Sequence, residues 1–404
     1  ITEVNGGNDN DVTDNYLSKK FAVTMGSTQR IPMIEHFSSS TCAPCVLLNS
    51  LMHNLCNNNP GKFTYTKYSV NWPGSGDPYF ISDSYDRCLF YNVSTVPQIF
   101  LDSELQVSNG TPQPVTNSKL SQRYAVPAFA DVRGAFNVEG NVITLTADVM
   151  TYVDLNDVKT YITVNEKTTT GNVGSNGETE FHHVMMKMLS SDQGAALDIN
   201  AGEYKRLEFS YDMSQTFMED INDLEVALWL QDEDTKEIYN SHYAYEYTDH
   251  CYPVQNMKAI EILDCTGAVE INWEAPEKGN PIGYNIYING KLIAENNANE
   301  LSYHSEDPKL IEEVRLGTSI AEVVAVYENN KTSVSVAKVL NGTWVNVEED
   351  LAVNNISIYP NPANDRLYIE TQTLTQTQTQ TQTQTIEIFD VYGRRQKSIV
   401  NSQR

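Results

Sequence analysis

Cys42 and Cys45 are separated by the two residues Ala43-Pro44 and lie between a predicted strand and a predicted helix. The apolar run at residues 31–37 predicts a buried strand, and the apolar spacing over residues 46–55 predicts a helix. Free backbone N–H groups and the positive end of the helix dipole at such a turn favour a thiolate at Cys42. A thiolate is the nucleophile of disulfide exchange, and Cys45, one turn along, could resolve a mixed disulfide.

A second segment accompanies this pair. A helix predicted over residues 83–93 leads through Thr95-Val96-Pro97 into an apolar strand at residues 98–102. Together with the cysteine pair, this order resembles the thioredoxin family, in which a cis-proline faces the two cysteines. The resemblance implies a thioredoxin-like α/β fold for residues 30–126 and a redox-active Cys42–Cys45 disulfide. It also implies that Thr95, Val96 and Pro97 bound a groove for an extended peptide.

Two alternatives for the cysteine pair stay open, a structural disulfide and half of a metal site. The sequence contains no second CxxC and no Cys/His pair at zinc-finger spacing, which makes zinc the weaker alternative. The uncharged spacer Ala43-Pro44 offers no side-chain stabilisation to a Cys42 thiolate, so a comparatively reducing couple is expected.

Other candidate site residues each allow two interpretations. His36 lies six residues before Cys42, where thioredoxin has a buried acid, and Glu35 should point to the opposite side of the strand. His36 could accept the proton of Cys45 during resolution, or it could be a packed core histidine. Trp72 could flank the site or anchor its own loop. Thr41 stands where thioredoxin has a tryptophan.

The composition limits the classes of function. The chain has 404 residues, too many for one core, and a net charge of −26, which argues against nucleic acid or anionic membranes as partners. The acidity lies mainly in residues 127–250. No run of eighteen apolar residues predicts a transmembrane helix, and the chain starts at Ile1 without a recognisable signal peptide, as if already processed. Six cysteines suggest an exported protein.

Residues 127–250 predict an antiparallel β-sandwich, because short strands alternate with Gly, Asn and Asp turns. The strands are predicted at residues 132–138, 142–149, 159–164, 224–231 and 237–241. Between them, residues 181–188 contain His182, His183 and three methionines, which could bind copper. A strand would divide these side chains between two faces, so ordinary packing is preferred and no metal or cofactor is predicted. Residues 30–250 together resemble a family of Bacteroidota outer-membrane and surface proteins.

Residues 251–347 resemble a fibronectin type III domain. Trp273 ends a strand predicted at residues 269–273, an Asn289-Gly290 turn follows a second strand, and a late strand is predicted at residues 322–327. Cys251 and Cys265 bracket the first predicted strand and are expected to form a structural disulfide. A 15-residue loop closed in this way gains on the order of 3 kcal/mol.

The remaining cysteines, Cys56 and Cys88, fall on the two predicted helices of the thioredoxin-like module. In a thioredoxin topology these helices cover opposite faces of the sheet, which puts the two residues beyond the short Cα separation that a disulfide tolerates. Two buried free thiols are therefore expected.

The C-terminal residues 348–404 carry a further resemblance. Residues 356–369 and 386–395 resemble successive hairpins of a type IX secretion C-terminal sorting domain, separated by a Thr/Gln tract at residues 371–385. The resemblance implies the type IX secretion machinery as a partner and delivery through the periplasm to the cell surface or the medium. The domain is expected to be partial, since the sequence stops about halfway through it. Residues 1–29 read as a polar linker.

The sequence therefore predicts a multidomain chain, a thioredoxin-like α/β fold followed by all-β sandwich domains. The predicted function is that of an exported thiol–disulfide oxidoreductase-like protein acting on protein or peptide thiols through Cys42 and Cys45, with Pro97 and His36 assisting. The alternative is a non-catalytic surface binding protein or adhesin on a thioredoxin scaffold. A protease or glycosidase lacks support, because the sequence has neither a Gly-x-Ser-x-Gly turn nor a His-Glu-x-x-His helix.

Overall fold

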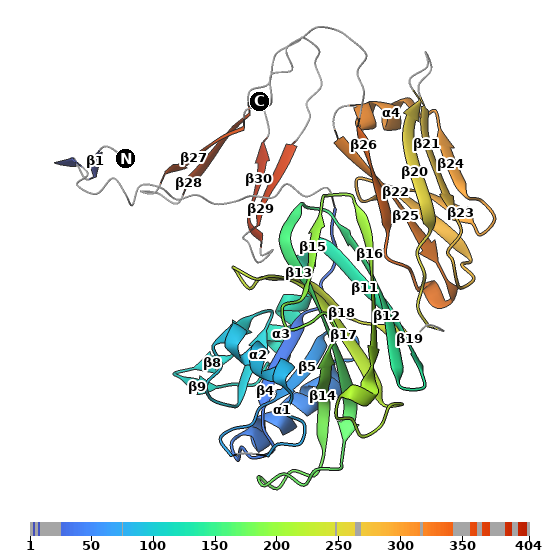
Figure 1. The fold of residues 1–404 in the computed structure, drawn as a ribbon. Coiled ribbons are helices and arrows are strands. Elements are labelled where there is room, and N and C mark those ends of the chain that lie inside the picture. The colour runs from blue at the N-terminus through green and yellow to red at the C-terminus, as the bar shows by residue number, and fades with distance from the viewer. Residues whose placement is uncertain are drawn as a thin grey trace. The chain divides into compact units, whose positions relative to one another are not determined.

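A computed structural model of the chain describes residues 3–4, 7–8, 26–74, 76–246, 249–262, 268–315, 318–341, 356–361, 366–371, 384–389 and 395–401. The chain divides into two compact units, residues 1–342 and residues 343–404, which are described separately. Most of the regular structure is β-strand (Figure 1).

One large sheet forms the centre of the first unit, in the order β18-β17-β13-β14-β5-β4-β6-β7, with β15 also paired to β13. Its strands are β4 (Met33–Ser38), β5 (Thr64–Ser69), β6 (Gln98–Leu101), β7 (Glu104–Leu105), β13 (Leu155–Thr169), β14 (Phe181–Met188), β15 (Ala195–Ile199), β17 (Leu224–Asp232) and β18 (Ile238–Tyr243). β4 runs parallel to β5 and antiparallel to β6.

The sheet crosses the boundary predicted at residues 126–127. β14 pairs in parallel with β5 at Val184 and Lys67. Beside this pairing, Thr66 Oγ1 lies 2.8 Å from Thr163 Oγ1, and Asn165 Nδ2 donates to the Tyr65 carbonyl at 3.1 Å. The first two predicted modules, residues 30–126 and 127–250, therefore share one hydrogen-bonded sheet.

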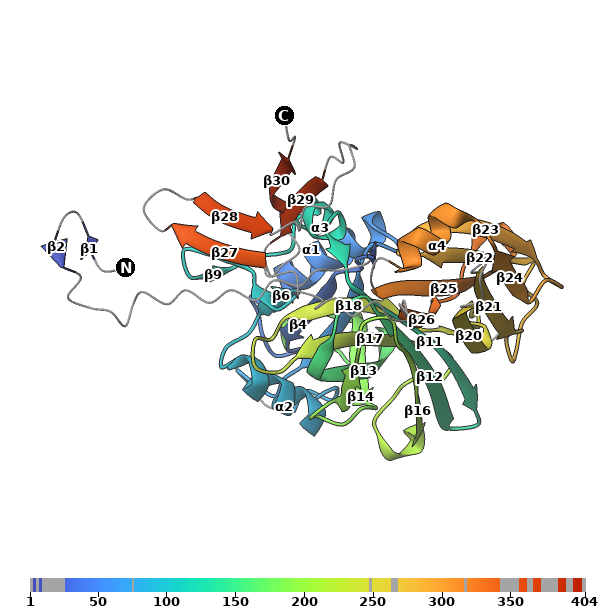
Figure 2. The same cartoon turned by 90° about the horizontal axis from the view of Figure 1, so that it is seen from above.

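Three helices accompany the strands of the first predicted module: α1 (Cys45–Asn58), α2 (Ser82–Tyr91) and α3 (Asn117–Tyr124). Side chains alternate along β4, so Ile34 packs in the core beneath α1 while Met33 and Phe37 pack in the core that contains α2 residues. Figure 2 shows α1 and α2 on opposite sides of β4.

Cys56 of α1 and Cys88 of α2 lie in these two separate cores. Both are buried free thiols, which confirms the prediction that they do not form a disulfide. Burial raises the pKa of each thiol to about 12, so neither supplies a thiolate at neutral pH.

A second sheet, ordered β16-β12-β11-β19, covers one face of the sandwich strands. It comprises β11 (Ala130–Glu139), β12 (Val142–Thr151), β16 (Tyr204–Asp212) and β19 (Tyr245–Glu246). A large apolar core joins it to β13, β14 and β17. The strands predicted in this region are present and longer than predicted. β15 and β16 were not predicted. β15 is only five residues long, and β16 carries several charged side chains and has no buried residue.

Residues 251–341 form two further sheets, ordered β20-β21-β24 and β23-β22-β25-β26. Their strands are β20 (Gln255–Ile262), β21 (Ala268–Glu274), β22 (Gly283–Ile288), β23 (Lys291–Asn297), β24 (Ser302–Ser305), β25 (Thr318–Val326) and β26 (Val336–Asn341). Trp273 is buried with its ring edge-on to Tyr284, and Asn289 and Gly290 take the positive φ angles of the predicted turn. A helix that was not predicted, α4 (Pro308–Arg315), contributes to the same core.

Short two-stranded sheets complete the fold. In the first unit, β1 (Glu3–Val4) pairs with β2 (Gly7–Asn8) and β8 (Val107–Ser108) with β9 (Thr111–Pro112) as hairpins, while β3 (Thr28–Gln29) pairs with the distant β10 (Pro127–Ala128). The second unit contains β27 (Ile356–Asn361) with β28 (Arg366–Thr371) and β29 (Gln384–Phe389) with β30 (Arg395–Asn401). The two predicted sorting-domain hairpins coincide with these pairs. Most of the Thr/Gln tract, residues 372–383, lies outside the described residues.

Candidate functional site

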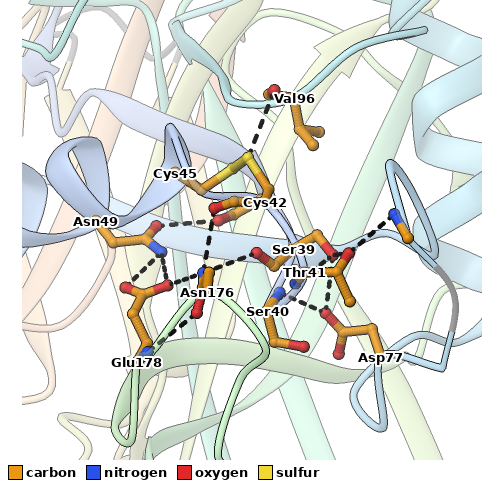
Figure 3. Close-up of a disulfide and its surroundings, with 12 residues drawn as sticks. Ser39, Ser40, Thr41, Cys42, Cys45, Asn49, Asp77, Val96, Asn176 and Glu178 are labelled. Carbon is orange, nitrogen blue, oxygen red and sulfur yellow. Dashed lines mark hydrogen bonds between the residues drawn. A yellow bond between two sulfur atoms is a disulfide. The ribbon is translucent and has the colours of Figure 1, made fainter.

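The cysteine pair lies in the turn between the end of β4 and the start of α1. Cys42 and Cys45 form a disulfide with a Cα–Cα separation of 5.3 Å (Figure 3). Pro44 has helical φ and ψ angles directly before Cys45, the first residue of α1, and the Cys42 N–H donates to the Ser39 carbonyl at 3.1 Å. Cys42 is 1% exposed and Cys45 is fully buried, while the spacer residues are exposed. The strand, turn and helix were predicted correctly, whereas nothing in the sequence indicated how deeply the two sulfur atoms are buried.

The Pro97 segment lies beside Cys42. The Val96–Pro97 peptide bond is cis, and the Val96 carbonyl oxygen is 3.6 Å from Cys42 Sγ. Pro97 is buried and Val96 is half-buried, whereas Thr95 is exposed and accepts a hydrogen bond from Gln98 Nε2 at 3.3 Å. In the reduced protein the Cys42 thiol could donate to the Val96 carbonyl.

Trp72 belongs to a loop that contacts the cysteine turn through other residues. Its own ring packs in the core on the α2 side, edge-on to Tyr85. Gly74 N–H donates to Thr41 Oγ1 at 3.2 Å, and Asp77 accepts the Ser40 N–H at 2.8 Å. A Cβ at Gly74 would lie 2.8 Å from the Thr41 Cβ, so the approach requires glycine. The hydrogen bonds from this loop to the cysteine turn are therefore made by Gly74 and Asp77, while Trp72 packs against the same core as Val96.

His36 is fully buried beneath α1. Its Nδ1 lies 2.5 Å from Tyr65 Oη, and its Nε2 has no hydrogen-bond partner among the described residues. Burial, helped by the positive charge of Lys67, holds the pKa of His36 well below its ordinary value, so the ring is neutral at pH 7. Within the described part of the chain, His36 makes no hydrogen bond to either cysteine. A neutral imidazole can accept a proton, but in the described structure neither cysteine is hydrogen-bonded to His36 to donate one directly.

Glu35 points to the opposite side of β4, as predicted. Its carboxylate accepts hydrogen bonds from Arg87 Nε at 2.7 Å and Nη2 at 3.1 Å, and from the hydroxyls of Tyr68 and Tyr91 at 2.8 and 2.6 Å. Arg87 also donates to Gln231 Oε1, at 2.5 Å, in the second predicted module. This buried network joins the two modules on the α2 side, and in the part of the chain that the structure describes it includes no hydrogen bond to Cys42 or Cys45.

The loop between β13 and β14 adds two residues that the sequence analysis missed. Asn176 Nδ2 donates to the Cys42 carbonyl at 3.2 Å, and the carboxylate of Glu178 accepts two hydrogen bonds from Asn49 Nδ2 at 2.9 and 3.0 Å (Figure 3). The local sequence shows only a Gly/Asn-rich turn. No short-range pattern connects Asn176 with Cys42, which lies 134 positions away.

The histidines and methionines of β14 make packing and hydrogen-bonding contacts. The His182 ring stacks on His53 of α1 with centroids 3.8 Å apart, and His183 Nδ1 lies 2.6 Å from a Glu225 carboxylate oxygen. The three methionines are buried. Among the described residues, no group of three or more His, Cys, Asp or Glu side chains could hold a metal ion.

The predicted Cys251–Cys265 bridge stays a prediction. Cys251 is a half-buried thiol whose pKa is raised by burial. Its predicted partner, Cys265, lies outside the described residues.

Lys67 makes stability depend on pH. It is 4% exposed on β5, and burial lowers its pKa to about 8, although the charge of Glu178 partly opposes this shift. An unfolded lysine titrates near 10.4, so the folded state binds this proton less tightly than the unfolded state does. The protonated side chain therefore lowers the free energy of unfolding. This loss of stability is complete below pH 8 and disappears as the pH rises towards 10.4. We expect Lys67→Met to raise the free energy of unfolding at pH 7 by on the order of 1–3 kcal/mol.

Urea unfolding at pH 7, 8, 9 and 10 checks this expectation. The advantage of Lys67→Met over the wild type should shrink as the pH rises. Lys62→Met, which removes an exposed charge just before the same strand, is the matched control and should show no such trend. An advantage for Lys67→Met that is absent at pH 7, or independent of pH, contradicts the account.

Comparison with known proteins identifies the domain formed by the C-terminal residues of the chain. Residues 357–403 match the secretion system C-terminal sorting domain. The chain is therefore exported by the type IX secretion machinery of Bacteroidota, to the outside of the cell or its surface. None of the helices in the described part of the chain is long and apolar enough to cross a membrane.

Solved structures give more distant likenesses. HBP35 of Porphyromonas gingivalis is 14% identical with a TM-score of 0.45, covering 78% of this chain and 99% of that one. A protein from Agrobacterium tumefaciens is 12% identical with a TM-score of 0.37, covering 54% and 95%. Fibronectin(III)-like modules of Clostridium thermocellum CbhA are 10% identical with a TM-score of 0.17, covering 22% and 93%. At these values the likenesses carry no assignment of function. No protein of curated function matches the sequence.

Proposed function

We propose that this chain is an exported thiol–disulfide oxidoreductase whose redox centre is the Cys42–Cys45 pair on a thioredoxin-like module. The observation that carries the proposal is the juxtaposition at the start of α1: a disulfide across two residues, with the carbonyl before cis-Pro97 3.6 Å from Cys42 Sγ. Cys56 and Cys88, whose thiols burial renders inert, take no part.

The exchange begins from the reduced pair. The Cys42 thiolate attacks one sulfur of a substrate disulfide, forms a bond to it and expels the other sulfur as a thiolate, which takes a proton from water. Cys45 then gives its proton to a base and attacks Cys42 Sγ, expelling the second substrate sulfur and forming the Cys42–Cys45 disulfide. Two electrons pass from the pair to the substrate. In the reverse direction the oxidised pair accepts two electrons from a substrate dithiol.

Backbone beside the pair would align the substrate. Thr95 is exposed and Val96 half-buried next to Pro97, so an extended peptide could pair with this segment as an added strand while its sulfur reaches Cys42. Trp72 and Val96 both pack against the core on the α2 side, so Trp72 is proposed to border this segment. His36, whose buried ring is neutral, is the proposed proton acceptor for Cys45.

A trapping experiment tests the proposal. In Cys45→Ser the first step can proceed but the second cannot. A substrate peptide should therefore remain linked to Cys42 through a mixed disulfide. We expect intact-mass spectrometry to show a dithiothreitol-sensitive adduct at Cys42 within minutes. Cys42→Ser, which lacks the attacking sulfur, is the matched control. A Cys45→Ser protein that gains no more adduct than Cys42→Ser defeats the proposal.

The second candidate function is a surface binding protein in which the same disulfide only staples the turn. The burial of both sulfurs favours it, since Cys42 is 1% exposed and Cys45 is fully buried. A stapled pair would resist reduction in the folded protein and show no trapping, whereas a redox pair must become accessible through a small movement of the turn.

A further inference from the structure

The β13–β14 loop, residues 170–180, brings a carboxylate from the second predicted module to the cysteine turn. Asn176 Nδ2 donates to Glu178 Oε2 at 2.7 Å and to the Cys42 carbonyl at 3.2 Å, so one amide group bridges the carboxylate and the cysteine backbone (Figure 3). Asn49, in the second turn of α1, donates two further hydrogen bonds to Glu178.

The contact is built from both sides. Asn49 is itself buried and accepts a hydrogen bond from Ser38 Oγ at 3.1 Å, which fixes its amide group towards the loop. The Asn176 backbone N–H donates to the Ser40 carbonyl at 3.2 Å. A Cβ at Gly174 would lie 2.7 Å from that same carbonyl oxygen, so the loop approaches as closely as only glycine permits.

The charges around the pair have opposite effects on a Cys42 thiolate. Among the described residues, the acidic groups hydrogen-bonded to this turn and its helix are Glu178 and Asp77, which accepts the Ser40 N–H. Lys67 is the basic group beneath α1, and its charge interacts with Glu178. His36 is neutral at pH 7 because burial lowers its pKa. A nearby carboxylate disfavours a thiolate, and losing thiolate stabilisation makes a disulfide harder to reduce and its dithiol a stronger reductant.

We propose that Glu178 is a positioning residue of the Cys42–Cys45 couple, supplied by the second module, and that its carboxylate holds the couple at the reducing end of its range. The pair then serves as an electron donor to disulfide-bonded proteins or peptides, and an exported dithiol reductant must re-reduce it after each turnover. This inference rests on the proposed function and gives it a direction. It also gives the shared sheet a role, because that sheet carries the loop to the site.

The test compares neutral variants at two positions of the same loop in the full chain. Glu178→Gln removes the bonded carboxylate, while Glu180→Gln removes an exposed carboxylate that pairs with His182. Each protein is equilibrated with defined ratios of reduced and oxidised glutathione. The redox state of the Cys42/Cys45 peptide is read by differential alkylation and mass spectrometry, which separates it from the other cysteines.

We expect the equilibrium of Glu178→Gln to shift about tenfold towards the reduced pair, which corresponds to about 30 mV, with a lowered pKa of the Cys42 thiol. Glu180→Gln should stay within about twofold of the wild type, and Glu178→Asp, which keeps the charge, should stay close to it. Glu178→Ala replaces Glu178→Gln if the glutamine variant does not fold.

The outcomes separate the two claims. Equal equilibrium constants for Glu178→Gln and Glu180→Gln overturn the inference and leave the proposed function standing. A shift of Glu178→Gln towards the oxidised pair also overturns it, since that sign means a structural loss instead of a removed charge. A wild-type pair that glutathione does not reduce at any ratio defeats the proposed function itself.

Discussion

Replacing Arg87 with methionine is expected to lower the free energy of unfolding by about 3–5 kcal/mol, because it leaves the buried Glu35 carboxylate without its counter-charge. The side chains of both residues are 1% exposed, and Arg87 Nε lies 2.7 Å from Glu35 Oε1. The guanidinium also lies over the rings of Phe90 and Tyr161, at 4.3 and 4.5 Å from their centroids. Urea unfolding followed by circular dichroism measures the loss.

Two variants make this prediction specific. Lys62→Met removes an exposed positive charge and should change stability by less than about 0.5 kcal/mol. Adding Glu35→Gln to Arg87→Met removes the orphaned charge and should restore part of the loss. If Arg87→Met is no less stable than Lys62→Met, the buried pair does not hold α2 and the second module together as described.

Cys42→Ser is expected to lower thiol–disulfide exchange by roughly 10³-fold or more, to the uncatalysed background, because a serine hydroxyl cannot replace the thiolate as nucleophile. Reduction of a disulfide-linked fluorescent peptide by the pre-reduced protein measures the rate. The substitution also removes the Cys42–Cys45 disulfide, but this bond spans a short turn that retains its backbone hydrogen bonds, so the fold should survive.

The other cysteines provide the controls for Cys42→Ser. Cys56→Ser and Cys88→Ser alter buried thiols whose pKa burial raises to about 12, so their exchange rates should match the wild type wherever the variants fold. An exchange rate of Cys42→Ser within a factor of about three of the wild type would show that the chemistry lies elsewhere in the chain.

Much of the local structure could be predicted because short-range patterns encode it. The β4 strand, the α1 helix and the turn between them follow from the apolar spacing around Cys42 and Cys45. The opposite faces of Glu35 and His36 follow from strand alternation. The separation of Cys56 from Cys88 was expected from the resemblance to a thioredoxin topology, in which the two helices cover opposite faces of the sheet.

The missing parts depend on contacts between distant residues. The pairing of β14 with β5 joins Val184 to Lys67, and nothing in either strand sequence specifies that partner. Asn176 and Glu178 could not be found for the same reason, since a polar turn usually faces solvent. Trp72 allowed two interpretations because a tryptophan in a loop can either pack against the core or flank a site, and the local sequence does not distinguish the two.

The burial of the sulfurs also lay beyond sequence reasoning. The exposed spacer Ala43-Pro44 and the apolar start of α1 do not reveal how deeply Cys42 lies. That depth depends on the Val96 segment and on the packing of the whole turn. It makes access to Cys42 the central question about this chain.

The reduction potential of the Cys42–Cys45 pair in the full chain, titrated against glutathione, tests the central claim most directly. The account predicts a value within the range of known oxidoreductases, roughly −270 to −120 mV, and towards its reducing end. A value below about −300 mV, typical of structural disulfides, would contradict it. The disulfide would then be a staple, and the function would have to lie in the β domains.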